Sequence, residues 1–286
     1  MGQFTFTNPD LHMHSVYSDG TDTPDALLEN VKKAGVDIFS LTDHDTYAGC
    51  EKLRSWLKPG DPYFVGGVEL SCKDSDGKYH ILGYSYDVAK PSIRDAVMLT
   101  HNARMSKLTR RIDYLKELGY SFTDYEVSAL LTLKNPGKPH IASLMMHKGY
   151  VETIDQAFEI MSGYHGKEIY LSPEAAIDAI IRADGVPVLA HGILGDGSDE
   201  LTEEQITARV EKLKGYGLMG AECYYSKYTE EQKEIMLSLA AKYNLLITAG
   251  SDYHGTNKPV AIGQTNSPDP EKMQRFYRAV ARLIAK

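Results

Sequence analysis

The sequence of 286 residues is poor in cysteine, in long apolar runs and in positive charge. Its three cysteines, Cys50, Cys72 and Cys223, are odd in number and widely spaced, which disfavours a disulfide framework and fits no CxxC metal site. No apolar stretch reaches the length of about 18 residues that a membrane-spanning helix needs. The formal net charge of -8 disfavours a long nucleic acid as partner, because affinity for a polyanion comes mainly from lysine and arginine.

The segment Met1–Leu11 has neither the basic region nor the apolar core of a signal peptide. We therefore predict a cytoplasmic protein without membrane contacts, whose partner is a small substrate. The oligomeric state stays open. With 42% hydrophobic and 24% charged residues, the composition is that of a globular chain with one large domain or two moderate ones.

Short apolar segments alternate with longer stretches of helical spacing. The strand candidates after the first are Val36–Leu41, Tyr63–Val68, His80–Tyr84, Val186–Ala190, Leu218–Cys223 and Leu245–Ala249. This alternation predicts βα units around a parallel sheet. A helix over Ala26–Ala34 is also predicted, with Thr23 as its capping residue, Pro24 at its first position and Gly35 beyond its end.

The alternation stops between Pro91 and Leu171, where the sequence has helical or loop character and no convincing buried strand. Helices are predicted over Ile93–Leu118 and Asp124–Leu133. We therefore expect an inserted, mainly helical subdomain over residues 91–171, within a catalytic domain made of residues 1–90 and 172–286.

Histidines and carboxylates recur at or beside the strand ends. The first strand candidate ends in Asp10-Leu11-His12-Met13-His14, where alternation directs His12 and His14 to the same face. One such pair is a weak signal. The later strand ends and the loops after them carry Asp19, His44, Glu69, His191, Asp252 and His254, and the fourth strand begins at His80.

In a parallel barrel the carboxyl ends of the strands share one face, where such folds build their active sites. Each of these nine side chains alone could be a satisfied structural histidine or a turn residue, but their coincidence at the strand ends favours a common metal site. Mixed imidazole and carboxylate ligands suit Mn, Fe or Zn. Two or three such ions would lower the pKa of a shared water and bind phosphoryl oxygens, which the hydrolysis of a phosphate ester requires.

The motifs that carry these residues resemble those of the polymerase and histidinol phosphatase (PHP) family, over nearly the whole chain. They are Asp10-Leu-His12-Met-His14-Ser, Ser18-Asp19-Gly-Thr, Thr42-Asp-His44-Asp-Thr, Gly67-Val-Glu69-Leu-Ser and Gly250-Ser-Asp252-Tyr-His254-Gly. The resemblance implies an α/β fold, a distorted seven-stranded β/α barrel with a trinuclear metal centre. It is strongest to the stand-alone phosphoesterases that act on nucleotides, such as nucleoside 3′,5′-bisphosphate phosphatases.

The resemblance also implies how the ligands divide among two to three divalent ions, with Mn favoured and Fe or Zn as alternatives. The first ion would be held by His12, His14, Glu69 and Asp252, the second by Glu69, His80 and His191, and the third by Asp19, His44 and His254. Glu69, His191 and Asp252 are the expected catalytic residues. A hydroxide bridging the ions would attack phosphorus, and His191 or a metal-bound water would protonate the leaving alcohol.

Substrate contacts are expected from the insertion. Arg104 belongs to a basic helix face that either contacts phosphate or is simply exposed. Lys138-Pro139-His140 replaces an Arg-Pro-His segment of the related nucleotide phosphatases, so Lys138 and His140 are further candidates, although lysine lacks the bidentate fork of arginine. By contrast, His101, His147 and His165 match no motif and are predicted to lie at the surface.

The favoured substrate is a small phosphomonoester of the nucleotide type, either a nucleoside 3′,5′-bisphosphate or a nucleoside monophosphate. Histidinol phosphate, the 5′ end of short RNA cut in the 5′-3′ direction, and an amide cut by a metal-dependent amidohydrolase remain alternatives. A module that binds metal or phosphate without turnover is disfavoured, because all nine motif positions keep residues able to bind metal.

Overall fold

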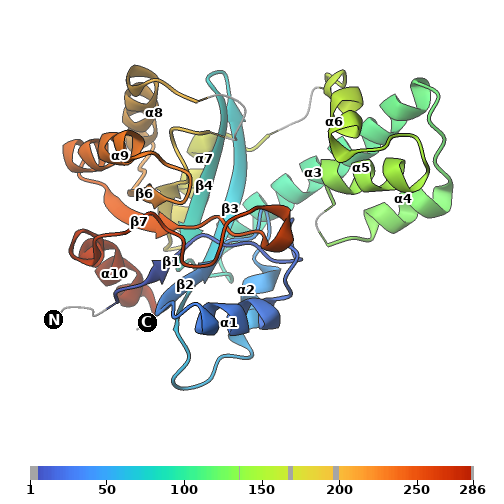
Figure 1. Cartoon of the computed structure of the whole chain (residues 1–286). Coiled ribbons are helices and arrows are strands. Elements are labelled where there is room, and N and C mark those ends of the chain that lie inside the picture. The colour runs from blue at the N-terminus through green and yellow to red at the C-terminus, as the bar shows by residue number, and fades with distance from the viewer. Residues whose placement is uncertain (1–5, 135, 167–169, 196–199, 285–286) are drawn as a thin grey trace.

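The computed structural model describes residues 6–134, 136–166, 170–195 and 200–284. Figure 1 shows a curved sheet surrounded by helices, with a group of helices set to one side. The strands are β1 (Pro9–Asp10), β2 (Ile38–Leu41), β3 (Tyr63–Asp74), β4 (Gly77–Tyr84), β5 (Val186–Leu189), β6 (Gly220–Tyr225) and β7 (Leu246–Gly250). Among the described residues, no helix is long and apolar enough to cross a membrane.

The helices follow the strands or form the insertion. Those around the sheet are α1 (Pro24–Lys33), α2 (Ala48–Arg54), α7 (Pro173–Arg182), α8 (Glu203–Gly215), α9 (Glu230–Lys242), the short η1 (Gly255–Asn257) and α10 (Pro270–Ile284). Those of the insertion are α3 (Pro91–Glu117), α4 (Asp124–Leu131), α5 (Lys138–His147) and α6 (Ile154–Ser162). The predicted helix over Ala26–Ala34 is α1, but the Thr23 side chain makes no capping hydrogen bond to it.

The seven strands lie in chain order from β1 to β7 and form the predicted barrel. Its two ends meet where Leu11 N donates to Ala249 O at 2.9 Å and where Met13 forms a parallel bridge with Tyr253. The expectation of an entirely parallel sheet is wrong for β4, which is antiparallel to both β3 and β5. Only two residues separate β3 from β4, a connection that suits a hairpin and is too short for a parallel crossover.

The reversed direction of β4 places its beginning beside the end of β3. His80 pairs directly with Ser71, two residues beyond Glu69. Side chains directly opposite in an antiparallel pair point to the same face, and so do residues two apart on one strand. Glu69 and His80 therefore share a face, although one lies late in its strand and the other early.

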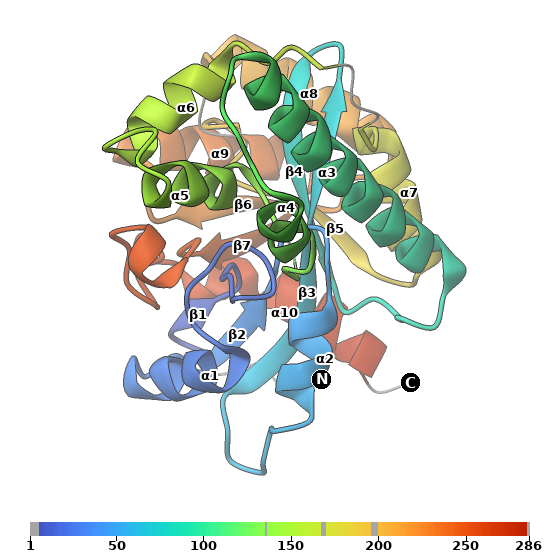
Figure 2. The same ribbon diagram turned by 90° about the vertical axis from the view of Figure 1, so that its right-hand side faces the viewer.

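Two separate cores stabilise the chain. The larger one lies between the strands and the helices around them, and it includes Ile93 and Ala96 from the start of α3. The second core lies within the insertion and includes Leu108, Ile112 and Leu115 from the later part of the same helix. With 27 residues, α3 is about 40 Å long and belongs to both cores. In Figure 2, which faces the insertion, α3 to α6 lie in front of the barrel strands.

The insertion helices begin at sequence signals that fix their start. Thr123 Oγ1 accepts a hydrogen bond from Glu126 N at 3.2 Å, and Glu126 Oε2 accepts one from Thr123 N at 2.7 Å. Thr153 and Gln156 form the same reciprocal pair at the start of α6. Such pairs satisfy backbone donors that the first helical turn leaves unpaired.

Because the insertion has its own core, its stability should be separable from that of the barrel. Ile112→Ala should cost about 2–5 kcal/mol through the cavity that it leaves, and should raise amide hydrogen exchange mainly in α3 to α6. Ile177→Ala, an equally buried change in the larger core, is the matched control and should affect the barrel. Equal increases in both regions for both variants would show a single cooperative unit instead.

Candidate metal centre

Glu69 lies at the centre of the predicted ligand set, fully buried near the end of the barrel strands. Its Oε1 is 3.1 Å from His80 Nδ1 and 3.1 Å from His191 Nε2. Its Oε2 lies 3.2 Å from His12 Nε2, 3.2 Å from His14 Nε2 and 3.1 Å from His44 Nδ1. The two oxygens thus face two different groups of imidazoles, which is the arrangement of a carboxylate able to bridge two ions.

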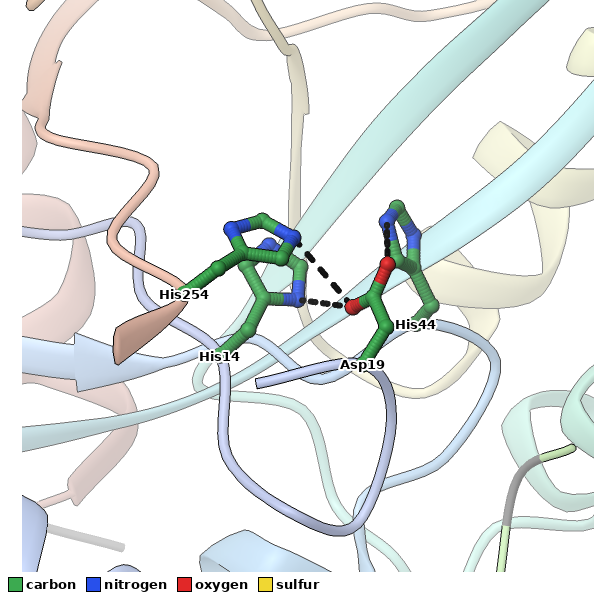
Figure 3. A group of neighbouring side chains, drawn as sticks. All are labelled: His14, Asp19, His44 and His254. Atoms are coloured by element: carbon green, nitrogen blue, oxygen red, sulfur yellow. Dashed lines mark ion pairs between the residues drawn. The ribbon is translucent and has the colours of Figure 1, made fainter. Parts of the chain in front are cut away.

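Asp19 and Asp252 occupy the other side of the cluster. Asp19 Oδ1 is 3.2 Å from His254 Nε2 and 3.7 Å from His14 Nδ1, and Figure 3 shows both rings and His44 pointing toward this carboxylate. Asp252 Oδ1 lies 3.3 Å from His14 Nε2. All nine predicted ligands therefore lie together in the fold.

Ligand atoms of these residues fall into four overlapping groups, within each of which they lie no more than 4.8 Å apart. The groups are His14, Asp19, His44 and His254; His12, Glu69 and His191; His12, His14 and Asp252; and His44, Glu69 and His80. The overlap at Glu69 and at the two histidines of the HxH pair fits ions that share ligands. The set of nitrogen and oxygen donors suits Mn, Fe or Zn.

Several buried ligand atoms point at one another without forming hydrogen bonds. Within the described part of the chain, such atoms include His12 Nε2, His14 Nε2, Asp19 Oδ1, Glu69 Oε2 and His254 Nε2. Buried polar atoms in folded proteins nearly always have a partner, so a cluster of exceptions needs an explanation. Divalent ions would supply the missing partners, and the residues therefore fit a metal centre.

The charges of the cluster reinforce this fit. Burial alone would raise the pKa of Glu69, but the imidazoles of His44 and His12 hold it well below its ordinary value. The pKa of Asp252 is likewise well below its ordinary value, against the effect of burial, because the imidazoles of His14 and His12 lie beside it. Both carboxylates are thus charged at neutral pH and ready to bind a cation.

The backbone is strained where the ligands converge. His191 and Asp252 have φ angles of 28° and 58°, in the left-handed region that side chains other than glycine rarely adopt. His191 N donates to Glu222 Oε2 at 2.8 Å, and Asp252 N donates to His12 O at 2.8 Å. These hydrogen bonds hold the two residues in their unusual backbone conformations. In proteins generally, such conformations cluster at functional sites.

Glu222 belongs to the site but was not predicted. This buried carboxylate of β6 contacts His12 Nδ1 through Oε1 at 3.1 Å while its Oε2 accepts from His191 N. Glu222 therefore orients the ring of His12 and holds the backbone of His191. The sequence signal that could have identified Glu222 is its position as a charged residue inside an apolar strand. Gly250 permits this packing, because a Cβ there would lie 2.3 Å from both Glu222 Oε1 and His12 Cβ.

Asp43 and Asp45 flank His44 in the chain. Asp43 accepts hydrogen bonds from Ser15 N and from Ser18 Oγ, and Ser18 Oγ lies 3.3 Å from His14 Nδ1. Asp43 thus holds the loop that leads to Asp19 and reaches the imidazole only through Ser18. Asp45 instead forms an ion pair with Arg104 at 2.6 Å.

A cavity of about 410 Å³ adjoins the cluster and extends beneath the insertion. Asp19, His44 and His80 form one wall. The other walls carry Lys78, Arg104, Lys107, Arg111, Lys138 and His140. All three predicted substrate contacts, Arg104, Lys138 and His140, therefore line it. Lys78 was not predicted, although it lies two residues before His80 on the same strand and so shares its face.

Other predicted features lie away from this cavity. Arg110, another basic residue of α3, lines a separate groove that shares only Ala103 with this cavity, so the basic residues of the helix face two different hollows. The side chains of His147 and His165 are exposed and that of His101 is partly exposed. Cys223 is fully buried and packs within the larger core, as expected for a structural thiol.

Comparison with known proteins gives consistent matches. A model of the PHP domain matches residues 10–181. Phosphoribosyl 1,2-cyclic phosphate 1,2-diphosphodiesterase of Eggerthella lenta is 30% identical, over 86% of this chain and 94% of the relative. A 5′-3′ exoribonuclease of Haemophilus influenzae is 26% identical, over 86% of this chain and 89% of the relative. A 3′,5′-nucleoside bisphosphate phosphatase of Chromobacterium violaceum is 25% identical, over 97% of this chain and 98% of the relative.

The fold has a solved counterpart of the same extent. The crystal structure of a candidate metal-dependent phosphoesterase from Bifidobacterium adolescentis superposes with a TM-score of 0.82 at 29% identity, covering 100% of both chains. The barrel and its insertion are therefore shared with a solved protein along their whole length.

The contacts of Glu222 lead to a prediction about metal affinity. Glu222→Gln keeps the shape of the side chain but removes the charge beside His12 and weakens the acceptor for His191 N. We expect metal affinity to fall by ~10–100-fold, measured by competition with a chelator and by metal content. Glu204→Gln, on the exposed surface of α8, is the control. Equal affinity in both variants would remove Glu222 from the site.

Proposed function

Because the chain belongs to the PHP family of metal-dependent phosphoesterases, we propose that it hydrolyses a small ribose compound with two phosphate groups. The favoured class is the nucleoside 3′,5′-bisphosphate. One phosphate would be cut at the nine-residue cluster, and the other would lie in the adjoining cavity. The observation that carries this proposal is the concentration of five lysine and arginine side chains in that cavity, in a chain of net charge -8.

The cations are crowded enough to repel one another. Burial lowers the pKa of Lys138, and the neighbouring charges of Arg111 and Lys107 lower it further. A phosphate bound among these side chains would relieve the repulsion, since charge-assisted hydrogen bonds to phosphate are among the strong ones in proteins. Arg104 is already held by Asp45, which fixes the direction of its guanidinium.

The size of the cavity also favours a small substrate. Its volume of about 410 Å³ lies within the usual range for small-molecule sites. Histidinol phosphate has only one phosphate and carries an amine, which would add a cation to an already cationic cavity. The named substrates of two relatives, a nucleoside bisphosphate and a phosphoribosyl cyclic phosphate, each contain two phosphate groups on ribose.

The division of labour between metal ions and side chains follows from this geometry. Divalent ions held by the nine residues would activate water and neutralise charge on the phosphoryl oxygens. Glu69 would fix the spacing of the ligands around it, and Glu222 would hold His12 and the His191 backbone. The cations of the cavity would orient the substrate so that only one of its phosphates reaches the cluster.

A second candidate is the removal of nucleotides from the 5′ end of short RNA. The exoribonuclease relative covers most of this chain, and the same cavity could receive a terminal phosphate. The two functions differ in substrate length, because a bisphosphatase acts on single nucleotides whereas an exoribonuclease also acts on RNA of several nucleotides.

The deciding experiment is phosphate and nucleotide release by Mn-loaded protein of measured metal content. The substrates are adenosine 3′,5′-bisphosphate, the 3′- and 5′-monophosphates, histidinol phosphate, and 5′-phosphorylated RNA of two to ten nucleotides. We expect the highest kcat/KM for the bisphosphate. A preference for RNA that increases with length would favour the exoribonuclease, and a preference for histidinol phosphate would reject the two-phosphate model.

Substitution of Glu69 tests the cluster itself. Glu69→Gln removes the one negative charge that both groups of imidazoles around this side chain share. We therefore expect a loss of kcat greater than ~100-fold together with reduced metal content. Metal analysis and turnover are measured on the same preparation. Near-normal activity at full metal occupancy would contradict the central role of Glu69.

Substitution of Arg111 tests the cavity. Arg111→Met should raise KM for the bisphosphate by ~10-fold or more, because a charged hydrogen bond is lost, and should change KM for the monophosphate much less. Arg110→Met removes the same charge from the adjacent position, which lines the separate groove and not the cavity, and is the matched control. If both variants weaken both substrates equally, the cavity does not select a second phosphate.

A further inference from the structure

The two oxygens of Asp252 have different surroundings. Oδ1 faces the ligand rings, 3.6 Å from His12 Nε2 and 3.3 Å from His14 Nε2. Oδ2 points the other way and accepts from Tyr225 Oη at 2.9 Å and from Lys258 Nζ at 2.7 Å. These two donors hold the carboxylate so that it offers Oδ1 to the cluster.

Lys258 is an unusual neighbour for a metal centre. Its ammonium repels the divalent ions that the cluster would hold, because like charges in a partly buried site are weakly screened. The Tyr225 hydroxyl already orients Oδ2 without adding a charge. Orientation of Asp252 alone therefore does not account for a cation at this position.

The surroundings of Lys258 indicate what else it contacts. Its side chain is 31% exposed, against 5% for Asp252, and it lines a second cavity of about 530 Å³ with Tyr225, His191 and Glu69. An ammonium group has three hydrogens, of which the contact with Asp252 uses one. The others are available toward the cavity, beside the cluster.

We propose that Lys258 binds the phosphoryl group that is being hydrolysed, while it and Tyr225 position Asp252. This inference rests on phosphoester hydrolysis at the cluster, as proposed above, but not on the identity of the leaving group. The negative charge of the phosphoryl group balances the positive charge of the Lys258 ammonium, which divalent ions alone would repel. Lysine suits this task because it contacts phosphate as a compact point charge.

The segment that carries Lys258 is tied to the rest of the site. Asn257 Nδ2 donates to Asp19 O at 2.8 Å, and Thr256 N donates to Thr21 Oγ1 at 3.0 Å. Lys258 follows directly after this short helix, η1. Its backbone is therefore held against the loop that supplies Asp19, which keeps the ammonium near the ligands.

Lys258 also lies apart from the cations beneath the insertion. The cavity that it lines contains Tyr225 and Lys227 of the barrel, whereas the insertion cavity contains Lys138 and Arg111. The two cavities meet at Asp19, His44 and His80, so the two basic groups approach the cluster from two adjoining cavities. They would act on different phosphates of one substrate, Lys258 on the phosphate that is cut and the insertion on the phosphate that is retained.

The test measures the affinity of metal-loaded protein for inorganic phosphate, by calorimetry and by product inhibition, at verified metal content. Lys258→Met should weaken phosphate binding by ~10-fold or more, and Lys258→Arg should restore most of the affinity. Tyr225→Phe should lower metal affinity and leave phosphate affinity within about twofold at saturating metal, because it removes only an orienting hydrogen bond. Lys258→Gln replaces the Met variant if the latter does not fold.

Lys227→Met is the control for charge alone, since Lys227 lines the same cavity. Unchanged phosphate affinity in the Lys258 variants would overturn the proposal, and so would an equal loss in Lys227→Met, which would indicate a general field effect. Inorganic phosphate is released from every phosphomonoester, so this test does not depend on the leaving group. If the two-phosphate substrate model failed, the phosphate affinities would still decide the role of Lys258, and the two failures could be told apart.

Discussion

The structure of the site depends on one buried carboxylate. Glu69 has no contact with solvent, yet it keeps its charge because imidazoles surround both of its oxygens. A charge placed in a low-dielectric interior is unstable unless it is paired. The barrel satisfies this requirement by directing imidazoles from β4 and from the segments that follow β1, β2 and β5 toward Glu69 of β3. The nitrogen–oxygen distances of 3.1–3.2 Å suit groups that would share an ion as ligands.

The barrel, the helical insertion and the convergence of the nine candidate ligands could be predicted from the sequence because each has a local signal. The HxH pair and motifs such as Gly67-Val-Glu69-Leu-Ser lie at strand ends, so position along the chain already indicates position in space. The antiparallel β4 was missed because apolar periodicity does not encode strand direction. The two-residue connection between β3 and β4 was also hidden, because the predicted strands Tyr63–Val68 and His80–Tyr84 are shorter than the observed ones.

Glu222 and Lys258 were missed for another reason. Their proposed roles come from side-chain contacts that no motif encodes: Glu222 reaches His12 across 210 positions, and Lys258 contacts the outer oxygen of Asp252, a carboxylate already counted as a candidate ligand. No motif spacing predicts such pairs. A charged residue within an apolar strand, as at Glu222, signals that a partner exists without identifying it. Only the folded arrangement identifies the partner.

The arrangement of charges around the cluster explains how an acidic protein can select an anionic substrate. Carboxylates and imidazoles occupy the centre, where bound divalent ions would reverse the local charge. Lysines and arginines stand on two sides, one group on the insertion and the other around Lys258 on the barrel. Under the proposed function, a substrate with a single phosphate would contact only one group, whereas a bisphosphate would contact both. Because α3 belongs to both hydrophobic cores, it holds the insertion group against the barrel, and the separation of the two cationic groups would set the selectivity.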